Sequence, residues 1–189
     1  MIFLQVWIGD EIDDFRKSLI VNNLRFLGSK DKLVFIASKN YLKGYDNVEY
    51  INVNKYIQSI SDKFVKKIAR KIPKDRKFRY AVSDIIRLHY ASKNKKVLYL
   101  DTDVELKKEM ILQNNVYFHK NEIRVDYFIF YNSDNIDYFD KLLLNSLNDL
   151  SSNFEFRLRN RKWVLRNIDV DNIKTFDKSV YKHYALRGL

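Results

Sequence analysis

The hydrophobic positions of this chain follow two periods, one typical of strands and one typical of helices. Short apolar runs predict buried strands over Ile2–Ile8, Leu33–Ala37, Val48–Val53 and Val97–Leu100. Between them, apolar residues recur at helical spacing. They predict a helix that begins at Asp10 or Asp13 and ends at Gly28, one over Lys55–Ile72 that Pro73 ends, and one over Arg79–Lys93.

The alternation of strands and helices predicts an α/β fold that is largely parallel in its first half. After residue 106 the pattern changes. We expect strands at Val116–His119 and Val125–Tyr131, a helix over Ile136–Leu150, and short irregular structure from Phe154. The predicted sheet is therefore parallel in its N-terminal half and mixed after the Val97–Leu100 strand, with helices on both faces. We expect a single domain over 1–189.

Composition narrows the classes of protein. The chain has no cysteine, which excludes disulfides and thiolate metal sites and fits a reducing compartment. No apolar run is long enough to span a membrane, and the first nine residues lack the features of a signal peptide. We expect a cytoplasmic protein, with peripheral contact at the inner membrane face as a further possibility.

The formal net charge of +11 is unevenly distributed. Basic residues are concentrated over 63–79 and 157–166. Such runs are often solvated faces, and the alternative is a surface that binds phosphate groups. The partner would then be an anionic membrane, a diphosphate-linked glycan, or DNA.

Two carboxylates, Asp101 and Asp103, follow the buried run Val97–Leu100 directly. In an extended backbone such residues point the same way, about 6.5 to 7 Å apart. Placing two anions at the end of a buried strand is costly unless a cation lies between them. The pattern therefore predicts a divalent metal that holds a phosphorylated ligand, at the edge where open α/β sheets bind ligands.

A second pair of charges lies on the preceding predicted helix. Asp84 and Arg87 are three residues apart and share one helical face. A pair at this spacing is commonly a surface ion pair of little energetic value. The helix leads directly into Asp101, however, and this favours a role for the pair in the same site.

These segments together resemble a known family. The sequence Ser83-Asp84-Ile85-Ile86-Arg87-Leu88, followed by Leu98-Tyr99-Leu100-Asp101-Thr102-Asp103-Val104-Glu105, resembles the donor-site signature of GT-A glycosyltransferases. The opening Val6-Trp7-Ile8-Gly9 and the closing Tyr181-Lys182-His183-Tyr184-Ala185 are similar to that family's terminal segments. The similar group is the DXD sugar-binding family, family 32, of capsule, lipopolysaccharide and mannosyl transferases.

Two segments depart from the family pattern. Asn94-Lys95-Lys96 stands where the family usually has a Gly-Gly pair, and this is closer to family 8. The tail reads Leu186-Arg187-Gly188-Leu189 in place of the usual Ser-Trp ending.

The resemblance implies a GT-A-like, Rossmann-related sheet and a role for each matching residue. Residues 1–106 would form the nucleotide-sugar half and 107–189 the acceptor and closing half. The cofactor would be Mn²⁺ or Mg²⁺ on Asp101 and Asp103, with His183 as a further ligand or only a surface residue. Donor contacts would come from Trp7, Gly9, Asp84, Arg87, Asp101 and Asp103, unless the Trp7 ring is part of the core.

The implied activity is transfer of a sugar from a UDP- or GDP-sugar to a hydroxyl, in polysaccharide biosynthesis. The acceptor would be a surface glycan or a lipid-linked saccharide. The resemblance favours retention of configuration; if the enzyme inverts, Asp126 is the candidate catalytic base.

Three other functions remain open. A strand that ends in Asp-x-Asp also begins haloacid-dehalogenase-type phosphatases, but there the motif comes near the start of the chain and few residues follow it here. The chain could be a basic nucleic-acid-binding protein without catalysis. It could also be a glycosyltransferase that acts on modified DNA of the phage type.

Overall fold

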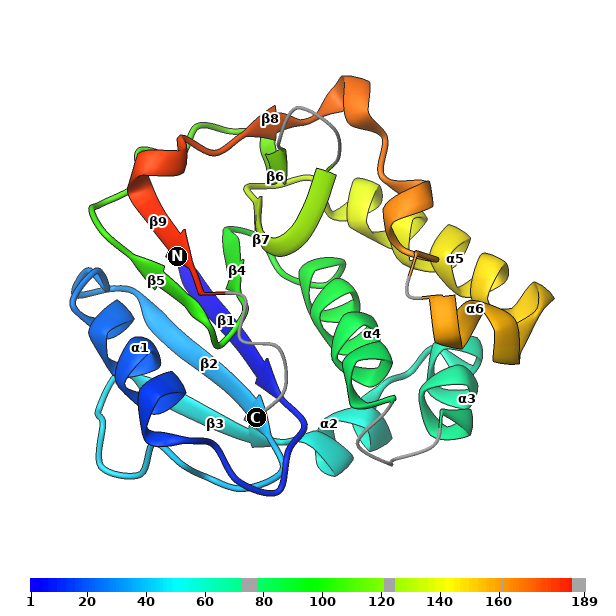
Figure 1. Cartoon of the computed structure of the whole chain (residues 1–189), viewed down its shortest axis with the longest axis horizontal. Helices are drawn as coiled ribbons and strands as arrows, with labels where there is room; N and C mark the ends of the chain where they lie inside the picture. The colour runs from blue at the N-terminus through cyan, green and yellow to red at the C-terminus, as the bar shows by residue number, and fades with distance from the viewer. Residues whose placement is uncertain (73–77, 121–124, 161, 185–189) are drawn as a thin grey trace.

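The computed structural model describes residues 1–72, 78–120, 125–160 and 162–184. Its centre is a seven-stranded sheet with helices on both faces (Figure 1). The strands of this sheet are β1 (Ile2–Trp7), β2 (Lys32–Ala37), β3 (Val48–Asn52), β4 (Val97–Leu100), β6 (Val116–Lys120), β7 (Val125–Asn132) and β8 (Lys174–Thr175). A separate two-stranded sheet pairs β5 (Val104–Leu106) with β9 (Tyr181–His183).

The strand order is β3-β2-β1-β4-β7-β6-β8. Strands β3, β2, β1 and β4 are parallel, whereas β7 pairs antiparallel with both β4 and β6. This confirms the predicted sheet, parallel in its first half and mixed after β4. Because β7 and β6 extend the sheet beyond β4, the two halves of the chain share one sheet; the functional division at residue 106 stays a prediction.

The helices match the predicted pattern with two exceptions: two helices replace one between residues 53 and 72, and a helix forms from Phe154, where short irregular structure was expected. They are α1 (Asp14–Leu24), α2 (Val53–Ser59), α3 (Lys63–Lys71), α4 (Arg79–Ala91), α5 (Ile136–Ser152) and α6 (Phe154–Asn160). Of the two proposed caps for α1, Asp13 is the one used, since its side chain accepts from the Arg16 backbone N–H. The helix ends at Leu24, before Gly28.

The prediction of a single helix over Lys55–Ile72 is wrong. The chain forms α2 and α3 instead, because Asp62 caps a new helix by accepting from the backbone N–H groups of Phe64 and Val65. The predicted terminator Pro73 lies outside the described residues.

Two hydrophobic cores lie on opposite faces of the sheet. One packs α2, α3, α4 and α5 against alternate residues of the central strands, with Leu4, Ile36 and Tyr99 among its buried members. The other packs α1 and the β5–β9 pair against the intervening residues, such as Phe3 and Phe35. This alternation is the expected consequence of a sheet that is covered on both sides.

The connection from α4 to β4 contains Lys96, which has a φ of 54°. This left-handed conformation favours glycine, and it occurs in the stretch where the resembling family has Gly-Gly. Two backbone hydrogen bonds stabilise it, from Lys96 N–H to the Ser133 carbonyl (2.6 Å) and from Ile2 N–H to the Lys96 carbonyl (2.8 Å). Lys96 thus takes a backbone conformation at this position that glycine would favour.

In the part of the chain that the structure describes, none of the helices combines the length and the apolar character that a membrane crossing needs.

Candidate functional site

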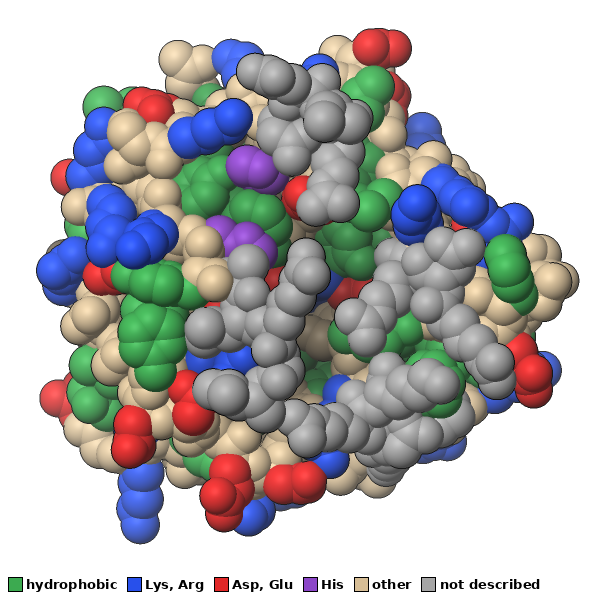
Figure 2. Space-filling view, in the orientation of Figure 1, with side chains coloured by type: hydrophobic (Ala, Val, Ile, Leu, Met, Phe, Trp, Pro, Cys, Tyr) green, Lys and Arg blue, Asp and Glu red, His purple; other side chains and the backbone are tan. Residues whose placement is uncertain are grey.

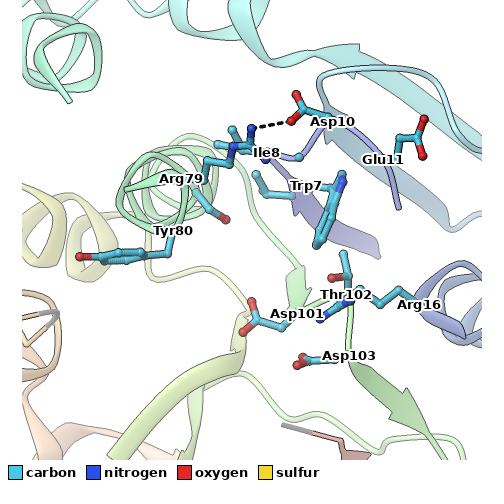
Figure 3. A pocket seen from close by; sticks show the side chains of 13 residues that line it. Trp7, Ile8, Asp10, Glu11, Arg16, Arg79, Tyr80, Asp101, Thr102 and Asp103 are labelled. Carbon is cyan, nitrogen blue, oxygen red and sulfur yellow. Dashed lines mark hydrogen bonds and ion pairs between the residues drawn. The ribbon is translucent and has the colours of Figure 1, made fainter. Parts of the chain in front are cut away.

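A cavity of about 530 Å³ opens where β1 and β4 end (Figure 3). Its lining comes from the end of β1, the start of α1 and α4, and the turn after β4. The lining residues are Val6, Trp7, Ile8, Gly9, Asp10, Glu11, Arg16, Arg79, Tyr80, Ser83, Asp101, Thr102 and Asp103. The sequence-predicted residues Trp7, Gly9, Asp101 and Asp103 therefore meet in one cavity, at the sheet edge where α/β folds bind ligands.

Trp7 lines this cavity and is not fully buried. A methyl group on residue 9 would lie 2.6 Å from the indole, so Gly9 is needed for the ring to take this position. The Arg16 guanidinium lies over the same ring, 5.4 Å from its centroid. Arg16 is itself held by an ion pair with the helix cap Asp13.

The loop after β1 is tied to two neighbouring elements. The Tyr41 hydroxyl donates to the carbonyl groups of Gly9 and Asp10. The Arg79 guanidinium, at the first turn of α4, donates to the Asp10 carboxylate at 2.7 Å, and Figure 3 shows this contact at the pocket. Arg79 of α4 is thus held at the pocket, which Arg16 of α1 also lines.

Asp101 and Asp103 lie in a tight turn and not in extended backbone. The Val104 N–H donates to the Asp101 carbonyl at 3.0 Å, which closes a turn over 101–104. The geometry expected from an extended strand is therefore wrong, because β4 ends at Leu100. Both carboxylates still line the cavity.

Asp84 and Arg87 are buried in a polar cage under the Asp101 carboxylate. One terminal nitrogen of Arg87 donates to Asp84, and the other donates to Asp101 Oδ1 at 2.9 Å. The rings of Tyr99 and Tyr127 lie on the guanidinium at 4.7 and 4.4 Å. The side chain of Arg87 is 7% exposed and that of Asp84 2%, so this pair is not the surface ion pair that its spacing commonly gives.

Two tyrosine hydroxyls complete the cage. Tyr99 donates to Asp101 Oδ1 and Tyr127 donates to Asp84 Oδ2 at 3.1 Å. Burial raises the pKa of Tyr127 to about 12, so its hydroxyl carries a proton at neutral pH. Because Oδ1 of Asp101 already accepts from Arg87 and Tyr99, Oδ2 is the oxygen left for a ligand.

The groups of this cage do not fully compensate the cost of burying the negative charge of Asp101. Burial is the main reason why the pKa of Asp101 is raised, and the nearby charge of Asp103 raises it further. Arg87 and the Tyr99 hydroxyl act in the opposite direction without cancelling the shift. An additional cation at this point would stabilise the carboxylate.

The C-terminal strand brings His183 to the second carboxylate. Strand β9 pairs with β5 so that His183 lies opposite Val104, and the Tyr184 N–H donates to the Asp103 carbonyl at 3.0 Å. The imidazole Nε2 lies 3.4 Å from Asp103 Oδ1. Burial lowers the pKa of His183, but the hydrogen bond and charge of Asp103 outweigh it, and the net pKa is raised.

A second, smaller hollow of about 200 Å³ also contains Asp101 in its lining. Its lining residues are Tyr80, Asp84, Arg87, Asp101, Asp126, Tyr127 and Phe128. Asp101 and Tyr80 line both cavities, so the two are neighbours. Asp126, predicted from the sequence as a candidate base, thus lies close to the other site residues.

The residues present fit a hard divalent cation. In the first cavity four carboxylates face two guanidinium groups: Asp10, Glu11, Asp101 and Asp103 against Arg16 and Arg79. Within the described residues, no group of three or more His, Cys, Asp or Glu is placed to hold a metal ion. One or two carboxylates, with waters and substrate phosphates as the other ligands, is the usual way in which Mg²⁺ is bound beside a phosphorylated substrate.

Sequence reasoning missed several residues of this site. Arg16, Arg79 and Tyr80 line the first cavity but match no motif. The signal was weak but present, since Arg16 and Arg79 lie in the first turns of helices that follow or precede the motif strands. Only the three-dimensional arrangement of β1, α1 and α4 brings them together.

Comparison with known proteins gives a fold and no family. No family model matches the sequence, and no curated protein matches it. Among solved structures, the PaToxG glycosyltransferase is similar with a TM-score of 0.66 at 15% identity, over 88% of this chain and 66% of that one.

Two further glycosyltransferases are similar at a lower level. The apo form of GlyE from Streptococcus pneumoniae TIGR4 has a TM-score of 0.51 at 13% identity, over 92% of this chain and 44% of that one. An active-site mutant of LgtC has a TM-score of 0.51 at 11% identity, over 94% and 73%. The chain thus has the fold of these glycosyltransferases, GT-A-like as predicted, and spans about two thirds of PaToxG and less than half of GlyE.

Proposed function

We propose that this protein is a metal-dependent glycosyltransferase that moves a sugar from a UDP- or GDP-sugar to a hydroxyl acceptor. The proposal rests on one arrangement. Asp101 lines both a cavity that contains Trp7 and Asp103 and a smaller hollow that contains Asp84 and Arg87, at the sheet edge of a glycosyltransferase-like fold. A nucleotide on one side and a sugar on the other would place the bond to be broken beside the two carboxylates.

The first cavity would take the nucleoside diphosphate. Trp7 would stack on the base, in a position that is open to the indole only because residue 9 has no side chain. Arg16 and Arg79 are the cations of this cavity and would bind the diphosphate. Arg87 does not line this cavity, and its terminal nitrogens donate to Asp84 and Asp101, so we assign it to the smaller hollow.

Asp103 and Oδ2 of Asp101 would hold Mn²⁺ or Mg²⁺, with His183 beside Asp103. When bound, such a cation neutralises the charge that develops on the departing nucleoside diphosphate. The protein would supply the rest: Tyr99 and Arg87 fix the Asp101 carboxylate, and β9 holds His183 against Asp103.

The second hollow would take the transferred sugar. Asp84 and Asp101 offer carboxylate oxygens to sugar hydroxyls. Arg87 Nε is buried and has no hydrogen-bond acceptor among the described residues, so it is available to donate to a sugar oxygen. The volume of this hollow, about 200 Å³, leaves room for one monosaccharide.

Retention of configuration is the outcome that we propose, on the strength of the family resemblance. Asp126 lines the hollow and would act as catalytic base only in an inverting reaction. Product stereochemistry, read by NMR of the newly formed glycoside, separates the two mechanisms.

The acceptor that we propose is a surface glycan or a lipid-linked saccharide, bound by the half of the chain over 107–189. The exposed basic side chains of α3, with Lys162 and Arg166 of the second basic run, favour an acceptor carried on an anionic surface, either a membrane or DNA.

The test is Mn²⁺-dependent thermal stabilisation across a panel of nucleotides and nucleotide sugars. One nucleotide class is expected to raise the melting temperature, by an amount that grows with ligand concentration. Asp103→Ala is expected to abolish the Mn²⁺-dependent part of this shift.

A matched control is Asp171→Asn, which changes an exposed carboxylate outside both cavities. It is expected to behave as the unmodified protein. Equal shifts for Asp103→Ala and the unmodified protein, or no shift with any nucleotide, would show that the site does not bind a donor in this way.

A further inference from the structure

Phe128 of β7 contacts the candidate metal centre twice, once through its backbone and once through its ring. Its carbonyl accepts from the Asp101 backbone N–H at 2.8 Å. Its ring stacks on the His183 imidazole, with 4.0 Å between the ring centroids and 21° between the planes. Since that imidazole faces the Asp103 carboxylate at 3.4 Å, Phe128 contacts one carboxylate residue and the imidazole beside the other.

The His183 side chain has few other contacts that fix the orientation of its ring. It lies in a strand of three residues, β9, whose pairing with β5 holds the backbone but not the side chain. A metal-binding imidazole is usually oriented by a hydrogen bond from its second ring nitrogen. Within the described residues His183 Nδ1 makes no such bond, and Nε2 is the nitrogen that faces Asp103. The stack on Phe128 is therefore the contact that sets the tilt of the imidazole.

The Phe128 ring is itself held by rings from two other strands. His119 of β6 lies beside it at 4.7 Å between centroids, and Tyr181 of β9 contacts it at 6.0 Å with the planes 62° apart. The Tyr181 hydroxyl shares a hydrogen bond with His119 Nδ1. The β6–β7 register also shifts just before His119, and irregularities of this kind re-aim side chains beside sites. A ring that is fixed in this way can fix a neighbouring ring in turn.

We infer that Phe128 is a positioning residue of the metal centre: its ring holds the His183 imidazole against Asp103 by stacking, where other metal sites use a hydrogen bond. The inference rests on the proposed function, since it takes Asp103 and His183 to bind the cation. Loss of a contact that orients a metal ligand weakens metal affinity by about 10–100-fold in known sites.

The stack is tested first in the unmodified, metal-free protein, by NMR of the imidazole protons. The chain has three histidines, so His183→Gln identifies the signal of His183. The face of the Phe128 ring is expected to move this signal upfield, and Phe128→Leu is expected to reverse the shift. His89, buried beside Tyr56, is the internal reference. An unshifted His183 signal overturns the inference, and this measurement does not depend on the folding of any Phe128 variant.

The effect on the cation is measured by electron paramagnetic resonance of free Mn²⁺, with Mn²⁺ alone and with UDP or GDP added. Phe128→Leu is expected to weaken Mn²⁺ binding by about tenfold or more. Phe128→Tyr keeps a ring at this position and is expected to bind Mn²⁺ as the unmodified protein does. The matched control is Phe26→Leu, which removes another partly buried ring of the same core, one that lies against Arg25. It is expected to leave both Mn²⁺ binding and the His183 signal unchanged.

A double-mutant cycle shows whether Phe128 acts through His183. His183→Gln is expected to weaken Mn²⁺ binding by itself, and Phe128→Leu is expected to add little in that background. Equal losses from Phe128→Leu in both backgrounds would show that Phe128 acts through the Asp101 backbone instead, and would overturn the inference.

The remaining outcomes separate the inference from the proposed function. A folded Phe128→Leu protein or a His183→Gln protein that binds Mn²⁺ as tightly as the unmodified protein overturns the inference, while the metal site itself stands. If the unmodified protein binds Mn²⁺ no better than Asp103→Ala, with or without nucleotide, the proposed function fails and the inference fails with it.

Discussion

At the scale of single residues, the position of Trp7 depends on its neighbour two residues later. A methyl group built on Gly9 would meet three atoms of the indole ring at 2.6 to 2.7 Å. Contacts of this kind cannot be absorbed by a small side-chain adjustment, because the obstacle is a rigid ring. Gly9 therefore determines where the indole lies in the pocket.

Replacing Gly9 by alanine is expected to displace the indole, weaken nucleotide binding, and destabilise the fold by about 1–3 kcal/mol. The ring position can be followed by fluorescence in a Trp163→Phe background, because Trp7 and Trp163 are the two tryptophans of the chain. Nucleotide binding is followed by thermal shift.

Gly28→Ala is the matched control, since its new methyl group would meet only the Asp31 carboxylate, at 3.1 Å. Unchanged Trp7 emission in Gly9→Ala would show that Gly9 does not fix the indole, and altered emission with unchanged nucleotide binding would show that the indole does not form the base site.

The sequence predicted the acidic residues of the site better than its basic residues. Asp101 and Asp103 are two positions apart in one motif, so their proximity could be predicted, although the turn that contains them could not. Arg16 and Arg79 are far apart in the chain, and only the packing of α1 and α4 beside β1 brings them into one cavity. A local sequence pattern carries no information about which residues, far apart in the chain, line the same cavity.

At the scale of elements, the break between α2 and α3 shows the limit of hydrophobic periodicity. Apolar residues continue at helical spacing through Ile57, Ile60 and Phe64, which is why one helix was predicted. The Asp62 side chain instead accepts two backbone N–H bonds and begins a new helix. Capping is a local competition that an apolar pattern does not report.

Asp62→Ala is expected to lower the free energy of unfolding by about 1 kcal/mol, because two N–H groups at the start of α3 lose their acceptor. Ser61→Ala, at the exposed neighbouring position, is the control and is expected to leave stability nearly unchanged. Chemical denaturation followed by circular dichroism measures both. Equal stability of the two variants would show that the helix break has another cause.

The short strands β5 and β9 were not predicted, and the reason is physical. Each has three residues, too few for a period to be visible, and each is defined only by its partner far along the chain. Their pairing nevertheless places His183 beside Asp103. The central strands could be predicted because burial on both faces makes them continuous apolar runs.

At the scale of the whole molecule, positive charge is concentrated on one helix more than elsewhere. Figure 2 shows one face on which Lys and Arg side chains are interspersed with Asp and Glu. Helix α3 differs, with five basic residues and no acidic one: Lys63, Lys66, Lys67, Arg70 and Lys71. Among the described residues these have no carboxylate partner, whereas Arg157 of the second basic run is paired with Asp149 at 3.3 Å. The α3 face is therefore the stronger candidate for contact with an anionic surface.

We expect the protein to co-sediment with vesicles that contain phosphatidylserine and not with neutral vesicles, and binding to weaken as salt rises. Each basic side chain near such a surface contributes about 1 kcal/mol. Charge reversal of two exposed residues of α3, Lys67→Glu with Arg70→Glu, should therefore weaken binding by well over tenfold.

The control is Lys43→Glu, which reverses one exposed lysine away from α3. If the α3 variant binds vesicles as well as the control does, the helix is only a solvated face. If duplex DNA competes for the same residues with a steep salt dependence, a nucleic-acid acceptor is favoured instead.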